Sequence, residues 1–238
     1  MRALTAGVSM GGNARGGKDP LRLVAFDMDG VLVDHVSSWA AVHDALGTQN
    51  SGAVASYLAG EIDDREFILR DVALWRGARP EFGPGDLQQI LARVPRMFAM
   101  REAVAAVRAQ GATCAIVTGG LRGLAEMLVR EAGFSHFRAN DVVFGKDGRL
   151  QDDAVVDVPL RNKGGVLAAL QDRLGVSPAQ TAAIGDSQFD VGLFARSRIS
   201  VAFNPLDEAA SQHATHVVRG RDLRVAVAPV LDGMTLQR

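Results

Sequence analysis

Short apolar segments that alternate with helical patterns constrain this chain more than any other feature of its sequence. After Pro95, patterns typical of buried strands occur at 112–117, 181–184, 199–203 and 216–218, with a hairpin expected around residues 146–148. Helical patterns separate them, at 101–110, 121–131 and 164–174, with a short helix expected from Phe189. Strands separated by helices of this length predict right-handed βαβ units, and therefore an α/β fold with a doubly wound parallel sheet.

The first strand of this sheet is expected at 21–26, where a mostly apolar run ends in an acidic loop. The next sixty residues show helical patterns and no convincing strand, with helices expected at 38–46, 54–58, 65–75 and 86–94. We therefore expect a small helical domain at 35–94, inserted into a core formed by residues 21–34 and 95–238.

The first twenty residues are rich in glycine and end in Asp19-Pro20, so a flexible tail is expected at 1–20. Residues Gly12 to Lys18 have the spacing of a phosphate-binding loop. However, Asp19 stands where such a loop needs a serine or threonine to hold magnesium, and no strand precedes it. We reject this segment as a nucleotide site.

The composition excludes several classes of function. The 26 basic and 27 acidic residues give a net charge of −1, without the basic excess typical of nucleic-acid-binding proteins. No apolar stretch approaches the ~18 residues of a membrane helix, and the N-terminus lacks the apolar segment of a secretory signal. The single cysteine, Cys114, lies in an apolar run and is expected to be a buried thiol. We expect a soluble, cytoplasmic protein without nucleic-acid or membrane partners; its oligomeric state does not follow from the sequence.

Polar residues follow the predicted strands at the points where those strands end. In an open α/β sheet, ligands bind beyond the carboxyl ends of the strands. The residues placed there, or at a helix start nearby, are Asp27, Asp29, Gly30, Thr118, Gly119, Gly120, Lys163, Asp186 and Asp190. Carboxylates, a hydroxyl, a lysine and main-chain amides are thus expected to meet at one edge of the sheet.

These residue types indicate a site for a metal ion and a phosphate group. Neighbouring carboxylates repel one another unless a cation neutralises them, and Mg²⁺ prefers hard oxygen ligands. Opposite the metal, the Thr118 hydroxyl, the amides of Gly119 and Gly120 and the charge of Lys163 suit a phosphate.

Four segments in this order, DMDGV, VTGG, NKGG and GDSQFD, resemble the motifs of the haloacid dehalogenase superfamily, in its phosphoserine phosphatase-like branch. The resemblance covers nearly everything after the tail. It implies that Asp27 is the nucleophile that forms an aspartyl-phosphate, and that Asp29 is the general acid and base. It further implies that Asp186 binds magnesium together with Asp27 and the main-chain carbonyl of Asp29.

The same resemblance implies supporting roles for the other motif residues. Asp190 would support the metal ligands and position Lys163, while Thr118 and Gly119 would hold the phosphoryl oxygens and Lys163 would offset negative charge. The helical insert resembles the cap that closes over the substrate in these enzymes.

Residues within the insert bear on the substrate. Residues 67–77 resemble the family segment whose arginine binds the substrate carboxylate, with Arg70 at that position, although Arg70 could instead pair with Glu66 on the surface. Phosphoserine phosphatases carry a glutamate nine residues after the nucleophile that holds the serine ammonium, and here the residue is Val36. Phe189 also replaces the usual asparagine of the last motif. An apolar side chain cannot pair with a cation, so a different small phosphomonoester is expected, anionic if Arg70 faces the pocket.

The leading function is therefore a magnesium-dependent phosphatase that acts on a small phosphorylated metabolite. Two alternatives stay open: a phosphotransferase or phosphomutase of the same superfamily, and a catalytically silent phosphate-binding protein. The silent protein is disfavoured because Asp27, Asp29 and Asp186 are all present.

Overall fold

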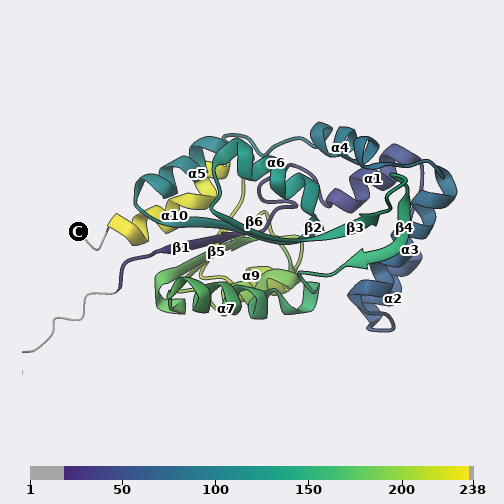
Figure 1. Ribbon diagram of the computed structural model, residues 1–238. Coiled ribbons are helices and arrows are strands. Elements are labelled where there is room, and N and C mark those ends of the chain that lie inside the picture. The colour runs from purple at the N-terminus through teal and green to yellow at the C-terminus, as the bar shows by residue number, and fades with distance from the viewer. Residues whose placement is uncertain (1–18, 236–238) are drawn as a thin grey trace, which may run out of the picture.

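A seven-stranded sheet forms the centre of the protein, seen in a computed structural model that describes residues 19–235 (Figure 1). The strands lie in the order β4-β3-β2-β1-β5-β6-β7 and are parallel except for β4, which runs antiparallel to β3. Their bounds are β1 Leu23–Phe26, β2 Thr113–Leu121, β3 His136–Phe144, β4 Leu150–Val155, β5 Thr181–Gly185, β6 Ile199–Phe203 and β7 His216–Val218. The doubly wound α/β fold and the hairpin expected from the sequence are confirmed.

The most apolar strands occupy the middle of the sheet. All four residues of β1 are buried, and β1 pairs in parallel with β2 on one side and with β5 on the other. Strands covered on both faces need apolar side chains at consecutive positions, which is the pattern of residues 23–26. The carboxyl ends of these three central strands therefore lie side by side at one edge of the sheet.

Helices cover both faces of the sheet (Figure 1). Helices α5 Met100–Ala109, α6 Arg122–Ala132 and α10 Leu223–Thr235 pack on one face, and α7 Lys163–Leu174, α8 Val191–Phe194 and α9 Glu208–His213 pack on the other. Side chains of β1 alternate between the two layers: Val24 and Phe26 join the first apolar cluster, whereas Leu23 and Ala25 join the second.

Four further helices follow β1 and gather beyond the carboxyl ends of the central strands (Figure 1). They are α1 Ser38–Leu46, α2 Ser51–Ala59, α3 Asp64–Ala78 and α4 Pro84–Arg93. The Ser37 side chain caps α1 by accepting hydrogen bonds from the main-chain amides of Trp39 and Ala40. Buried apolar residues of α1, α3 and α4 belong to the same cluster as those of β1, α5 and α6. The inserted helices therefore share the hydrophobic core of the sheet.

Some elements differ from the sequence-based predictions. Helices α9 and α10 were not predicted, and Pro229 and Gly233 inside α10 obscure a helical pattern whose apolar residues are nevertheless buried. Strand β2 continues past the expected end at residue 117 to Leu121. The predicted tail lies almost wholly outside the described residues, and so does the rejected Gly12–Lys18 segment.

Two smaller expectations are tested by the same structure. Cys114 is fully buried, and burial raises the pKa of its thiol to about 12, as expected for an unreactive structural cysteine. Among the helices of residues 19–235, none combines the length and apolar character needed to span a bilayer.

Candidate active site

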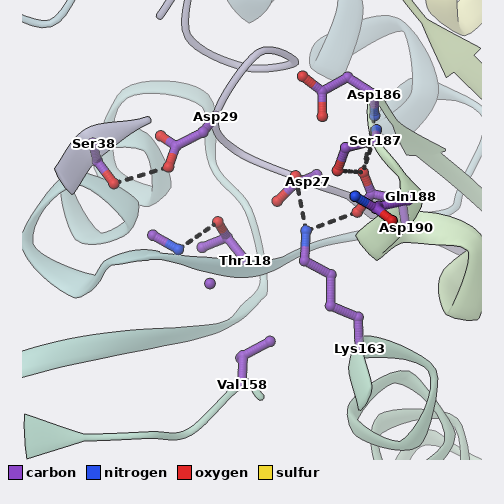
Figure 2. Close-up of polar contacts among 12 residues, drawn as sticks. Asp27, Asp29, Ser38, Thr118, Val158, Lys163, Asp186, Ser187, Gln188 and Asp190 are labelled. Atoms are coloured by element: carbon purple, nitrogen blue, oxygen red, sulfur yellow. Dashed lines mark hydrogen bonds and ion pairs between the residues drawn. The ribbon is translucent and has the colours of Figure 1, made fainter. Parts of the chain in front are cut away.

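The residues predicted from the strand ends come together at one edge of the sheet. Asp27 follows β1, Thr118 lies near the end of β2, Lys163 begins α7 and Asp186 follows β5. Together with Asp29 these four side chains line a cavity of about 370 Å³. Figure 2 shows Asp27 between Lys163 and Asp186, with Asp29 turned away toward Ser38.

A buried lysine links two of the aspartates. The Lys163 ammonium lies 2.8 Å from Oδ2 of Asp27 and 2.7 Å from Oδ1 of Asp190, and the Lys163 side chain is only 2% exposed. The other oxygen of Asp190 accepts hydrogen bonds from the amides of Asp186 and Ser187 at 2.9 and 3.1 Å. Asp190 therefore holds both the lysine and the turn that carries Asp186 (Figure 2).

Burial gives the aspartates unusual acidities. Burial, together with the charge of Asp190, raises the pKa of Asp27 to about 7, although Lys163 opposes this shift. Burial and the charge of Asp27 raise the pKa of Asp186 to about 9. Burial alone would lower the pKa of Lys163, but Asp190 and Asp27 outweigh it and hold this pKa above its usual value. The site thus holds more negative charge than one lysine neutralises, and it favours an additional cation.

Asp29 is held by a contact that the sequence did not reveal. Its Oδ2 accepts a hydrogen bond of 2.9 Å from the Ser38 hydroxyl, which in turn accepts one of 2.9 Å from the Leu121 amide. Burial raises the pKa of Asp29, partly offset by its hydrogen bond with Ser38. Ser38 thereby joins the start of α1 to the end of β2 and fixes the orientation of Asp29.

Three carboxylates are close enough to share a metal ion. One oxygen each of Asp27, Asp186 and Asp190 lies within 4.8 Å of the others. Two buried atoms of the described residues, Oδ1 of Asp27 and Oδ1 of Asp29, have no hydrogen-bond partner. An unpartnered buried carboxylate oxygen is costly, so Oδ1 of Asp27 fits a metal ion or a reacting group. The carboxylate of Asp29, in contrast, lies outside the three-carboxylate group.

Gly30 allows the acidic loop to approach Asp186. Its φ of +72° is strained for other residues, and a Cβ at this position would lie 1.9 Å from Oδ2 of Asp186. Any side chain at residue 30 would therefore displace the Asp186 carboxylate.

The Thr118-Gly119-Gly120 segment lines the cavity. The Gly120 amide donates a hydrogen bond of 3.0 Å to the Thr118 hydroxyl. The Gly119 carbonyl accepts hydrogen bonds from Trp39 Nε1 at 3.0 Å and from Asn140 Nδ2 at 3.3 Å. These bonds hold the segment in place beside the aspartates, as expected for residues that contact a phosphate.

Arg70 is the one predicted site residue that does not join the group. Its Nε donates a hydrogen bond of 2.9 Å to Glu66, and its side chain is not part of the cavity lining. The next residue, Asp71, is buried and lines the cavity instead. The Asp71 Oδ1 accepts from Asn50 and lies 2.8 Å from His43 Nε2. Helix α3 thus presents Asp71, rather than Arg70, to the cavity.

Aromatic residues of the insert pack against one another, and some of them also line the cavity. Trp75 is fully buried and stacks on Trp39 with ring centroids 5.6 Å apart, as expected for packing residues. Trp39 and Tyr57 also line the cavity, as do Val36 and Phe189, the two positions that differ from phosphoserine phosphatases.

Comparisons with known proteins show which proteins this chain resembles. The chain is 29% identical over 202 residues to the phosphoserine phosphatase SerB2 of Mycobacterium tuberculosis, which covers 82% of this chain and 48% of that protein. It is 25% identical over 216 residues to the phosphoserine phosphatase of Wolinella succinogenes, covering 87% of this chain and 99% of that protein. The solved structure of a phospho-aspartyl intermediate analogue of phosphoserine phosphatase shares the fold, with a TM-score of 0.73 at 20% identity, over 90% of this chain and 99% of that chain.

The match to a family model covers the whole predicted motif set. The chain spans about half to three-fifths of the length of the first curated relatives that it matches. Residues 24–195, well over half of the chain, match the model of the haloacid dehalogenase-like hydrolases, and this range includes Asp27, Thr118, Lys163 and Asp186. The resemblance seen in the four motifs is therefore confirmed, and the chain belongs to the haloacid dehalogenase-like hydrolase family.

Proposed function

We propose that this protein is a magnesium-dependent phosphatase that hydrolyses a small-molecule phosphomonoester through an aspartyl-phosphate. One observation carries the proposal: among the described residues, two buried carboxylate oxygens, Oδ1 of Asp27 and Oδ1 of Asp29, have no hydrogen-bond partner, and both residues line the cavity that Lys163 also lines. Unpartnered polar atoms are rare in protein interiors and are concentrated where they meet a ligand.

Asp27 acts as the nucleophile in this proposal. Its Oδ2 is held by Lys163, whereas its Oδ1 is free to form a bond with phosphorus. As this bond forms, the bond between phosphorus and the ester oxygen breaks. Lys163 and the Thr118-Gly119-Gly120 segment offset the charge that develops on the phosphoryl oxygens.

Asp29 acts first as the proton donor and then as the proton acceptor in this proposal. Because burial raises its pKa, Asp29 can hold a proton and donate it to the leaving ester oxygen, which departs as an alcohol. The Asp29 carboxylate then takes a proton from a water molecule, whose oxygen attacks phosphorus and releases phosphate and free Asp27. Ser38 keeps the carboxyl group oriented during both steps.

Magnesium fits the oxygen ligands of this site. Asp27 and Asp186 would hold it, together with the main-chain carbonyl of Asp29 that the family resemblance implies, while Asp190 orients the Asp186 turn. When bound, the ion supplies positive charge that draws the carboxylates and the phosphate together. This role agrees with the pKa values of Asp27 and Asp186, which are raised by burial and by the charges of neighbouring aspartates.

The inserted helices, residues 35–94, would act as a cap over the substrate. Val36 and Tyr57 lie on the cavity wall and would contact the alcohol part of the ester. Because Val36 cannot pair with an ammonium group, we propose a substrate other than phosphoserine. A cytoplasmic location is proposed from the single, buried cysteine, Cys114.

Phosphate release from a panel of phosphomonoesters tests this function. We expect release that requires Mg²⁺ and is abolished in Asp27→Asn, whereas the matched control Asp152→Asn, whose side chain is 71% exposed, retains wild-type activity. Release that persists in Asp27→Asn would contradict the proposed nucleophile. A protein that binds Mg²⁺ but releases no phosphate from any ester would contradict hydrolysis and favour phosphoryl transfer or a silent binding protein.

A further inference from the structure

The outer part of the cavity is apolar. Six of its lining side chains form what we call the apolar rim: Val36, Val54, Tyr57, Leu58, Phe189 and Leu206. They come from the inserted helices and from the segments that follow β1, β5 and β6. Four of them are markedly exposed: Val36 by 63%, Leu206 by 62%, Leu58 by 51% and Val54 by 44%. Single exposed apolar residues are ordinary, but several around one opening indicate a binding surface.

Among the described residues, no unpaired basic side chain lines this cavity. Arg161 lies nearby, with its guanidinium carbon 5.2 Å from the centroid of the Tyr57 ring, but it donates hydrogen bonds to main-chain carbonyls of α2 and is not part of the lining. Among the lining residues that the structure describes, Lys163 is the only basic side chain, and it is already paired with Asp27 and Asp190. Arg70 pairs with Glu66 and does not line the cavity.

Two carboxylates in the wall also disfavour an anionic group. Asp64 lines the cavity and accepts hydrogen bonds from the Tyr57 hydroxyl at 3.0 Å and from the Leu160 amide at 2.8 Å. Asp71 lies on the same wall, fixed by His43. A substrate carboxylate would meet these charges without a compensating partner, which is costly in a partly buried site.

Both wall carboxylates already have hydrogen-bond partners, and the apolar rim adds no carboxylate that could pair with an ammonium group. From this wall we infer that the alcohol part of the substrate is an uncharged apolar group, such as a small aryl or branched alkyl group, without carboxylate or ammonium. This inference rests on the proposed function and deepens it. The volume of about 370 Å³ suits a compact ester, since small-molecule sites range from about 300 to 1,000 Å³. Val36, at the position where phosphoserine phosphatases have a glutamate, is part of the apolar rim.

A series of alkyl phosphates tests the inference. From ethyl to hexyl phosphate, kcat/KM is expected to rise about two- to fourfold for each added methylene, because a buried methylene contributes up to about 0.8 kcal/mol and 1.4 kcal/mol corresponds to a factor of ten. Phenyl phosphate is expected to exceed O-phosphoserine, phosphoglycolate and O-phosphoethanolamine by at least about tenfold. A kcat/KM that does not change with chain length, or a preference for a charged ester, would overturn the inference.

Substitutions in the apolar rim test whether these side chains cause the dependence of kcat/KM on chain length. Leu206→Ser and Leu58→Ser are expected to reduce the gain per methylene, since both side chains line the opening. The matched control is Val217→Ser, which is 47% exposed on β7 and outside the cavity lining, and it is expected to leave the series unchanged. If the rim variants and the control variant change the increase in kcat/KM per methylene equally, the apolar rim does not bind the alkyl chain.

A binding measurement separates this inference from the proposed function. Calorimetric titration of alkylphosphonates, which are not hydrolysed, is expected to show affinity that rises with chain length. If no ester is hydrolysed but the phosphonates follow this trend, the apolar site stands and hydrolysis fails. If esters are hydrolysed with Mg²⁺ and Asp27 while neither series depends on chain length, hydrolysis stands and the apolar site is wrong.

Discussion

Replacing Lys163 by methionine removes the buried cation on which Asp27 and Asp190 depend. The ammonium lies 2.8 and 2.7 Å from these carboxylates, and its side chain is 2% exposed. Methionine keeps much of the volume but leaves two buried carboxylates unpaired. Breaking a buried ion pair by removing one partner costs about 3–5 kcal/mol, so we expect the free energy of unfolding of Lys163→Met to fall by this amount at pH 8 without Mg²⁺.

The loss of stability in Lys163→Met should become smaller as the pH falls. In the intact protein the pKa of Asp27 is about 7, and loss of the lysine charge raises it further. In the folded wild type Asp27 is mostly ionised at pH 8 and about half protonated at pH 7, whereas in the folded variant it is protonated to a greater extent at both pH values. The unfolded chains do not differ at Asp27. The difference in stability should therefore shrink by up to about 1 kcal/mol as the pH falls through this unit.

Urea unfolding at pH 8 and pH 6.5 in the presence of a chelator measures both effects. Lys146→Met is the matched control, because Lys146 is an exposed lysine in the turn between β3 and β4, and it should change stability by no more than about 0.5 kcal/mol. If the free energy of unfolding falls no more in Lys163→Met than in Lys146→Met, or if the loss does not diminish at lower pH, the account of this ion-pair cluster is wrong.

Three further predictions follow from single contacts. Ser38→Ala should lower kcat more than it raises KM and cost about 1–3 kcal/mol of stability, because it frees a buried oxygen of Asp29; steady-state kinetics with an unchanged kcat would contradict this. Gly30→Ala should abolish the Mg²⁺-induced rise in Tm by displacing Asp186, whereas Gly60→Ala, with φ of +79° and open space around it, should lose only about 1–2 kcal/mol and keep that response. The same rise in Tm should be larger at pH 8 than at pH 6, since Mg²⁺ must displace the proton that Asp186 holds up to a pKa of about 9; an equal or opposite trend would contradict it.

Much of the fold could be predicted because local patterns agree with the tertiary structure. The helix expected at 38–46 and the strands expected at 199–203 and 216–218 have those bounds in the structure. Helix α10 could not be predicted with the same ease, since Pro229 lies inside it. Its buried residues nevertheless keep helical spacing, which is the signal that could have revealed it.

The site was predictable where a residue directly follows a strand, and less so where it depends on helical phase. Ile68, Val72 and Trp75 form the buried face of α3, and Asp71 lies on that face, whereas Arg70 does not. This spacing would have placed Asp71, and not Arg70, on the buried face of the helix. Ser38 carried no such signal, because its contact with Asp29 depends on how α1 packs against the end of β2.

The central claim is that Asp27 becomes phosphorylated during turnover. We would mix the protein with Mg²⁺ and its best phosphomonoester, quench with acid within the turnover time and map the phosphoryl group by peptide mass spectrometry. The account predicts one phosphoryl group, attached to Asp27, absent without Mg²⁺ and absent in Asp27→Asn. Turnover with no covalent phosphate, or with phosphate attached to another residue, would contradict the account.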